Sequence, residues 1–309
     1  MNTLLLSHPA SLRHDMGPGH PERPDRIRVI ERILEHEKFQ TLIRDLAPQA
    51  SREAILRVHP AEHLALLEAR APSEGFAEID ADTRMCPDTL EAVLRAAGGA
   101  MQAVDEVMTG RVANAFVAMR PPGHHAERDK AMGFCFLNNV AIAARHAQKT
   151  HGAERVAIID FDVHHGNGTQ DIFWADPSVL YASTHEMPLY PGTGGATETG
   201  EFDTIVNAPL ASGSDGAAFR EAMDVAILPR VAAFAPDLIL ISAGFDAHHR
   251  DPLANLNLVE ADFGWITKRL MDIADKRCNG RVVSVLEGGY DLDGLARSVA
   301  AHVLTLMGA

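Results

Sequence analysis

Apolar and polar positions along the chain form two alternating patterns. Short runs that are mostly apolar and often β-branched have the length of buried strands, and longer stretches with apolar residues three or four positions apart have the spacing of helices. The strand-like runs are Thr3–Leu6, Ala115–Met119, Arg155–Ile159, Val179–Ser183, Thr204–Val206, Leu238–Ser242 and Val282–Leu286. The amphipathic stretches are Arg23–Glu37, Ser51–Arg57, Ala61–Ala69, Pro87–Met108, Leu137–Lys149, Gly216–Phe234, Glu260–Lys276 and Asp293–Met307.

This alternation predicts an α/β fold of three layers. Strand–helix–strand units favour parallel pairing, so we expect an αβα arrangement around a mainly parallel sheet of about eight strands. A chain of 309 residues, 46% of them hydrophobic, can bury a core of that size. The sequence shows no internal repeat and no linker rich in serine and glycine, so we expect a single domain over residues 1–309.

The segment after Arg155–Ile159 carries the most informative polar residues of the chain. It reads Asp160-Phe161-Asp162-Val163-His164-His165-Gly166-Asn167-Gly168. Side chains alternate faces along an extended strand, so we expect Asp160, Asp162 and His164 to project to one side. Parallel sheets bind ligands beyond the carboxyl ends of their strands, and buried carboxylates are costly unless they bind something. The segment therefore predicts a metal-capable site, the alternative being an acidic loop that follows a core strand.

Three further strand-like runs end in polar residues of the same kind. After Ala115–Met119 come His124 and His125, after Leu238–Ser242 comes Asp246, and after Val282–Leu286 comes Tyr290. Because the carboxyl ends of parallel strands meet at one edge of a sheet, we expect these side chains to converge. Each alone has a simple structural explanation as a loop, capping or packing residue, and their combination favours a functional site.

Asp162, His164 and Asp246 together have the composition of a catalytic metal site. Three protein ligands leave one coordination position free for water or substrate, as in catalytic zinc sites. Two carboxylates among the ligands also suit Fe²⁺, Co²⁺ or Mn²⁺. An ion of this kind activates water and polarises a carbonyl oxygen.

The remaining polar residues supply the other functions that hydrolysis needs. His124 and His125 can act as general base and general acid. Asp160 and Asn167 flank the metal segment and can orient these two imidazoles. Tyr290 can donate its hydroxyl proton to a developing oxyanion. The set predicts metal-assisted hydrolysis of an amide or related acyl bond.

Composition restricts the partners and the compartment. A formal net charge of −14 disfavours direct binding to nucleic acid and suits cationic substrates such as lysine-rich segments or polyamines. The chain has no run of about eighteen apolar residues, so we expect no membrane span, and its N-terminus lacks the features of a signal peptide. Its three cysteines are scattered, without a Cys-x-x-Cys pair, which favours a reducing compartment such as the cytoplasm. The sequence is compatible with a homo-oligomer.

Several motifs, in this order, resemble those of the histone deacetylase superfamily along nearly the whole chain. They are Arg120-Pro121-Pro122-Gly123-His124-His125-Ala126, Gly133-Phe134-Cys135-Phe136-Leu137-Asn138-Asn139, Asp160 to Gly168, Gly244-Phe245-Asp246 with Asp251-Pro252, and Gly288-Gly289-Tyr290. Asn167, where class I enzymes have Asp, and the segment Gly19–Pro24 point to the class II branch, which includes bacterial deacetylase-like amidohydrolases. The resemblance implies the arginase–deacetylase fold, one zinc ion, and removal of acetyl groups from acylated lysine side chains of proteins or from small acylated amines.

The resemblance also assigns roles to individual residues. It implies that Asp162, His164 and Asp246 are the zinc ligands. It implies that His125, paired with Asn167, is the main general base and acid, and that His124, paired with Asp160, is more cationic. Tyr290 would contact the acyl oxygen. It implies a substrate channel formed by Gly133, Phe134, Tyr190, Leu253, Gly288 and Gly289, with Tyr190 in place of the family's usual Phe. A structural potassium site is implied at Asp160, Asp162, His164, Ser183 and Thr184, and an internal cavity beneath the zinc at Arg26.

Three alternatives stay open at this stage. Acetylpolyamine amidohydrolases resemble this chain as well, but the polyamine-specific class IIb enzyme has Glu at the position of Leu253. A binuclear ureohydrolase of the arginase type needs further carboxylates where this chain has Gly166 and His248, which disfavours that reading. A non-catalytic binder of acylated ligands would be expected to lack a ligand, the histidine pair or the tyrosine, and all are present.

Overall fold

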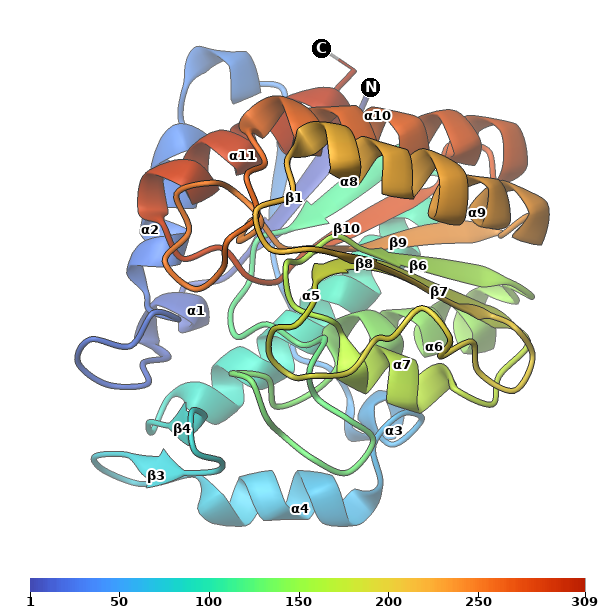
Figure 1. Ribbon diagram of the computed structural model, residues 1–309. Helices are drawn as coiled ribbons and strands as arrows, with labels where there is room; N and C mark the ends of the chain where they lie inside the picture. The colour runs from blue at the N-terminus through green and yellow to red at the C-terminus, as the bar shows by residue number, and fades with distance from the viewer. Residues whose placement is uncertain (309) are drawn as a thin grey trace.

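A parallel sheet of eight strands runs through the centre of the protein, for which a computed structural model describes residues 1–308 (Figure 1). The strands of this sheet are β1 (Thr3–Ser7), β2 (Ile43–Leu46), β5 (Asn114–Val117), β6 (Val156–Asp160), β7 (Val179–Glu186), β8 (Ile205–Leu210), β9 (Leu238–Ala243) and β10 (Val282–Leu286). Their order across the sheet is β2-β1-β5-β10-β9-β6-β7-β8, and every neighbouring pair is parallel. Two short strands, β3 (Ala77–Glu78) and β4 (Arg84–Met85), form a separate antiparallel hairpin.

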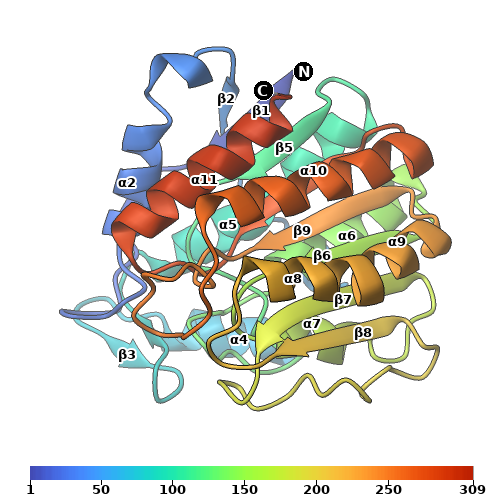
Figure 2. The ribbon, with the colours of Figure 1, turned by 45° about the horizontal axis from the view of Figure 1, so that its top comes forward.

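Helices cover both faces of the sheet, as Figure 2 shows. One face packs against α3 (Arg52–Ile55), α4 (Ala61–Arg70), α5 (Thr89–Met108), α6 (Asn139–His151) and α7 (Asn167–Phe173). The other face packs against α2 (Asp25–Ile33), α8 (Gly216–Ala222), the π-helical turn η2 (Met223–Ile227), α9 (Leu228–Phe234), α10 (Glu260–Arg277) and α11 (Leu292–Leu306). Two short helices, α1 (Ala10–Arg13) and the 3₁₀ turn η1 (Glu37–Phe39), lie in connections. The predicted three-layer αβα architecture with about eight strands is confirmed.

The sheet has a hydrophobic core on each of its faces, because side chains alternate between the two faces along each strand. In β6, Val156 and Ile158 belong to the core under α5 and α6, whereas Ala157 and Ile159 belong to the core under α10 and α11. All four are fully buried. A strand that is apolar at every position is therefore buried on both faces, which is typical of parallel sheets.

Several elements escaped the sequence prediction, among them the short helix α1. Strand β2 is exposed along its length and reads Ile-Arg-Asp-Leu, so it has no apolar run. The hairpin of β3 and β4 and the short helix α7 also lie outside the predicted elements. The amphipathic stretch Gly216–Phe234 is broken by η2, which ends two residues before Pro229, whose missing N–H cannot continue the regular helical pattern.

Five neighbouring strands direct their carboxyl ends to one edge of the sheet. The order β5-β10-β9-β6-β7 places the segments after these strands side by side, and they contain the residues expected to hold the metal, to catalyse the reaction and to line the channel, apart from Asp160 at the end of β6. Across the described residues 1–308, no helix has the length and apolar character needed to cross a membrane.

Candidate active site

Asp162, His164 and Asp246 converge at this edge of the sheet. His164 Nδ1 lies 3.1 Å from Asp162 Oδ1 and 3.1 Å from Asp246 Oδ2, and one ligand atom from each residue lies within 4.8 Å of the others. All three are buried. Strand β6 ends at Asp160, so Asp162 and His164 lie in the loop beyond it and not in an extended strand as expected.

The arrangement fits a divalent cation. A tetrahedral ion with ligands at roughly 2.0–2.2 Å holds neighbouring ligand atoms roughly 3.3 Å apart, close to the spacing seen here. Burial and the charge of Asp162 raise the pKa of Asp246 to about 7. Burial alone would lower the pKa of His164, but its contacts with the two carboxylates raise it to about 10. Two buried carboxylates thus attract positive charge at this point, and a metal ion can supply it.

Backbone N–H groups hold both carboxylates in place. Asp162 accepts hydrogen bonds from the backbone of His164 (2.9 Å) and of Gly288 (2.8 Å). Asp246 accepts one from the backbone of Val163 (2.9 Å). Partners of this kind orient metal-ligating side chains and are part of a working site.

The two histidines after β5 have different partners and different charges. His124 Nδ1 lies 3.0 Å from Asp160 Oδ2, and although burial would lower its pKa, the carboxylates of Asp162 and Asp160 raise it well above the ordinary value. His125 Nδ1 lies 2.8 Å from Asn167 Oδ1. Burial and the positive charge of His124 lower the pKa of His125 well below the ordinary value. One imidazole of the pair therefore favours the cation and the other the neutral form.

Asn167 is held by a further contact that decides which atom faces His125. Its Nδ2 donates to Glu127 Oε1 at 2.7 Å, so Oδ1 is the atom turned toward the imidazole. The Nδ1 of His125 must then carry the proton, because an amide oxygen can only accept. The Nε2 of neutral His125 is left with a lone pair.

Tyr290 lies across the same site and is positioned from both sides. Its backbone N–H donates to Asp251 Oδ2 at 2.7 Å, and the Cζ of Arg26 lies 4.9 Å from its ring centroid. Burial raises the pKa of Tyr290 well above its ordinary value, which keeps the hydroxyl protonated and able to donate.

A pocket of about 250 Å³ leads from the surface to these side chains. Its walls are formed by Asp82, His125, Gly133, Phe134, His164, Leu189, Tyr190, Leu253 and Tyr290. The rings of Tyr190 and His125 meet edge to face, with centroids 5.1 Å apart. At Gly133, which has φ +57°, a Cβ would lie 2.6 Å from the ring of His125, so only glycine leaves this wall open. The expected channel residues Gly133, Phe134, Tyr190 and Leu253 therefore share one pocket.

Gly288 and Gly289 do not line this pocket, in contrast to the expectation. A Cβ at Gly288 would lie 2.0 Å from Asp246 Oδ2 and 2.6 Å from Asp162 Oδ2. The carbonyl of Gly289 accepts a hydrogen bond from Arg26 Nε at 2.6 Å. Gly288 thus lies against the two carboxylates of the candidate metal site and Gly289 against Arg26, where the backbone packs closely.

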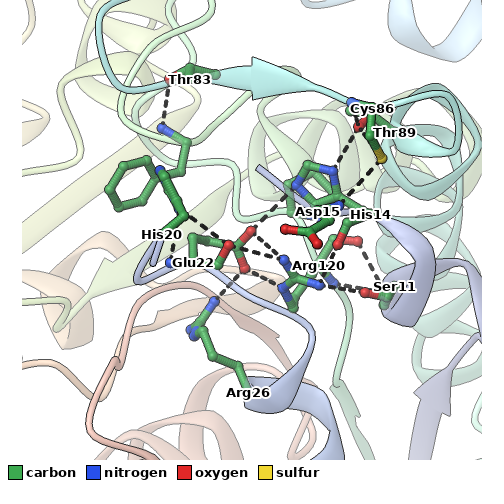
Figure 3. A network of polar contacts seen from close by, with 12 residues as sticks. Ser11, His14, Asp15, His20, Glu22, Arg26, Thr83, Cys86, Thr89 and Arg120 are labelled. Carbon is green, nitrogen blue, oxygen red and sulfur yellow. Dashed lines mark hydrogen bonds and ion pairs between the residues drawn. The ribbon is translucent and has the colours of Figure 1, made fainter. Parts of the chain in front are cut away.

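Arg26 belongs to a buried ionic network beneath the site (Figure 3). Glu22 lies between the guanidinium groups of Arg26, at 3.0 Å, and Arg120, at 2.7 Å. All three side chains are fully buried. Of the residues implied for a potassium site, Asp160 and Ser183 are paired across β6 and β7, and Ser183 Oγ lies 2.9 Å from His185 Nδ1.

Sequence reasoning missed two carboxylates that position the site. Glu287 Oε2 accepts hydrogen bonds from the backbone of Gly123 (2.7 Å) and of His124 (3.1 Å), and so fixes the loop of the histidine pair. Asp251 holds the backbone of Tyr290. Asp251 lies within a quoted motif and Glu287 directly precedes Gly288-Gly289-Tyr290, so their place in the sequence was the available signal. Asp82, in the loop between β3 and β4, forms part of the pocket wall.

Comparison with known proteins gives consistent results. A family model described as the histone deacetylase domain matches residues 20–306. The chain is 42% identical to a probable deacetylase of Archaeoglobus fulgidus, over 95% of this chain and 83% of that protein. It is 40% identical to a histone deacetylase-like amidohydrolase of Pseudomonas aeruginosa, over 88% of this chain and 73% of that protein. The crystal structure of the HDA15 HD domain superimposes with a TM-score of 0.94 at 36% identity, covering 99% of this chain and 88% of that one.

Proposed function

The chain belongs to the histone deacetylase family and has its arginase–deacetylase fold, and from this we propose that it is a zinc-dependent amidohydrolase. Its substrates would be acylated lysine side chains of proteins or similar small acylated amines, from which it removes acetyl or related acyl groups. A single domain over residues 1–309 is part of the proposal, as is a location in the cytoplasm, where three unpaired cysteines stay reduced.

One observation carries the proposal. His164 lines a pocket that also presents His125 and Tyr290, and its two partners in the cluster, Asp162 and Asp246, are buried next to it. A pocket of this volume, walled by Phe134 and Tyr190, suits a slender aliphatic stem more than a bulky substrate.

Zinc held by these three residues would supply an activated water molecule and polarise the carbonyl oxygen of the acyl group. The chain's own residues would perform the proton transfers. His125, with a free lone pair on Nε2, accepts the proton that the attacking water loses and returns it to the leaving amine. Tyr290 donates a hydrogen bond to the carbonyl oxygen as negative charge develops there. His124 stays cationic beside Asp160 and stabilises that charge at longer range.

Acetylpolyamine hydrolysis is the second candidate, and Asp82 favours it. A carboxylate in the pocket wall attracts cationic amines, and the chain as a whole is acidic. Leu253 opposes it, because an apolar side chain at the rim offers no partner to a charged polyamine. We rank lysine-type substrates first. A potassium ion at Asp160, Asp162, His164, Ser183 and Thr184 stays part of the proposal as a structural element.

The test compares the zinc-loaded protein with its Tyr290→Phe and His125→Ala variants on acetyl-lysine peptides, acetylpolyamines and longer acyl-lysines. Each variant should lose about 100-fold or more in turnover, because an oxyanion donor or a general base is removed, while its zinc content stays unchanged. Turnover equal to that of the wild type in either variant would refute the assigned roles. A strong preference for acetylpolyamines would reverse the ranking of substrates.

A further inference from the structure

A second group of metal-ligating side chains lies on one face of the protein, between α5 and α6. Asp105 comes from the last turn of α5, and His146 and His151 come from α6. One ligand atom from each residue lies within 4.8 Å of the others, as in the cluster of Asp162, His164 and Asp246.

The geometry brings both imidazoles to a single oxygen atom. His146 Nε2 and His151 Nε2 each lie 2.7 Å from Asp105 Oδ1. The two rings are nearly perpendicular, at 79°, with centroids 5.9 Å apart. Two imidazole nitrogens and a carboxylate oxygen are the ligands that Zn²⁺, Ni²⁺ and Cu²⁺ prefer. Small rotations of these side chains would bring the three atoms to the spacing that a tetrahedral ion requires.

The surroundings are suited to a cation. The histidine side chains are mostly buried, at 10% and 16% exposure, while Asp105 is 38% exposed, so an ion can reach the ligands from solvent and keep water in its remaining positions. Both helices end here, and the negative end of a helix dipole favours positive charge. Thr150 Oγ1 lies 3.2 Å from His146 Nδ1 and can accept a hydrogen bond from its N–H when Nε2 binds a metal.

We propose that Asp105, His146 and His151 form a second metal site, for a divalent transition-metal ion of the Zn²⁺ or Ni²⁺ class, that fastens the ends of α5 and α6 together. The site is separate from the catalytic one. Helices α5 and α6 lead into β5 and β6, so their last turns lie at the amino-terminal edge of the sheet, whereas the catalytic residues follow the carboxyl ends of the strands. The 13 residues of α6 alone span roughly 18 Å between these edges.

The test counts zinc ions in the full chain after equilibrium dialysis against micromolar zinc. The wild type should bind two ions, and His151→Ala and Asp105→Asn should each bind one. Asp246→Ala, which removes a catalytic ligand, should also bind one, and the double variant Asp246→Ala/His151→Ala none. His36→Ala removes an exposed imidazole elsewhere and should leave two.

The outcomes separate this proposal from the catalytic one. One ion in both the wild type and His151→Ala would overturn the second site, and the shared hydrogen bonds to Asp105 would be the whole role of the cluster. Two ions in Asp246→Ala would instead contradict the catalytic site. A crystal of the wild type soaked in Ni²⁺ should give an anomalous peak between the three side chains, and its absence would also count against the site. His151→Ala should keep wild-type turnover, because it lies at the other edge of the sheet.

Discussion

Replacing Gly288 by alanine should detach the metal from the site while leaving the fold intact. The added Cβ would lie 2.0 Å from Asp246 Oδ2 and 2.6 Å from Asp162 Oδ2, whereas ordinary contacts begin at 3.4 Å. One carboxylate must therefore move by more than 1 Å, and metal–ligand distances tolerate only about 0.2 Å. We expect the zinc affinity to fall by about 100-fold or more, which corresponds to about 2.7 kcal/mol of binding free energy.

The assay is competition for zinc with a chromophoric chelator of known affinity. The control is Gly264→Ala, at a position in α10 where the nearest atom to a new Cβ is Thr305 Oγ1 at 3.3 Å and where alanine favours the helix. The melting temperatures of the metal-free proteins show whether either variant unfolds. Wild-type zinc affinity in a folded Gly288→Ala variant would refute the placement of this glycine against the metal ligands.

Three further predictions concern the rim, the buried network and the core. Leu253→Glu should raise kcat/KM for acetylpolyamines relative to acetyl-lysine peptides by about two- to fivefold, since a partly exposed ion pair contributes up to about 1 kcal/mol. The neutral Leu253→Gln should leave this ratio unchanged. Equal ratios in the two variants would contradict the place of Leu253 at the pocket rim. Glu22→Gln should destabilise the protein to urea by about 3–5 kcal/mol, because it leaves two buried arginines without their carboxylate. Glu53→Gln, in an exposed pair, should leave the stability nearly unchanged, and an equally small effect of Glu22→Gln would count against the network. Burial lowers the pKa of His302 from 6.5 to about 3, so between these pH values the unfolded chain binds a proton that the folded protein does not bind. The contribution of neutral His302 to the free energy of unfolding is therefore complete above pH 6.5 and decreases as the pH falls, by about 2 kcal/mol at pH 5. His302→Gln should reduce the difference between urea stabilities at pH 7 and pH 5 by that amount, and an unchanged difference would show that His302 is not the cause.

The strands that carry the site could be predicted because they are buried on both faces. Runs such as Val282–Leu286, in which Ser284 is the one polar residue, are apolar on both faces, which is typical of parallel strands between two layers of helices. The polar residues directly after them, including Asp246 and Tyr290, then had to meet at one edge of the sheet. The exposed strand β2 could not be recognised, because an edge strand with polar residues has no distinctive period.

Contacts between different loops could not be predicted from the sequence. Gly288 was expected in the channel wall, but its position depends on how the loop after β10 packs on Asp162 and Asp246 from two other loops. Asp251 and Glu287 act on the backbones of residues far away in the sequence, and no spacing rule connects such partners. The strands themselves could be predicted from local patterns, whereas these loop contacts depend on which strands are neighbours in the sheet.

The most direct test of the catalytic proposal is to titrate zinc into the metal-free protein while following acetate release from an acetyl-lysine peptide. A His151→Ala background keeps the second cluster from competing for the metal. We predict that activity is absent without metal, rises in proportion to added zinc, and reaches its plateau at one ion per chain, with no rise in a variant that also carries Asp246→Ala. Full activity without metal, or activation by zinc when Asp246 is missing, would contradict the central claim.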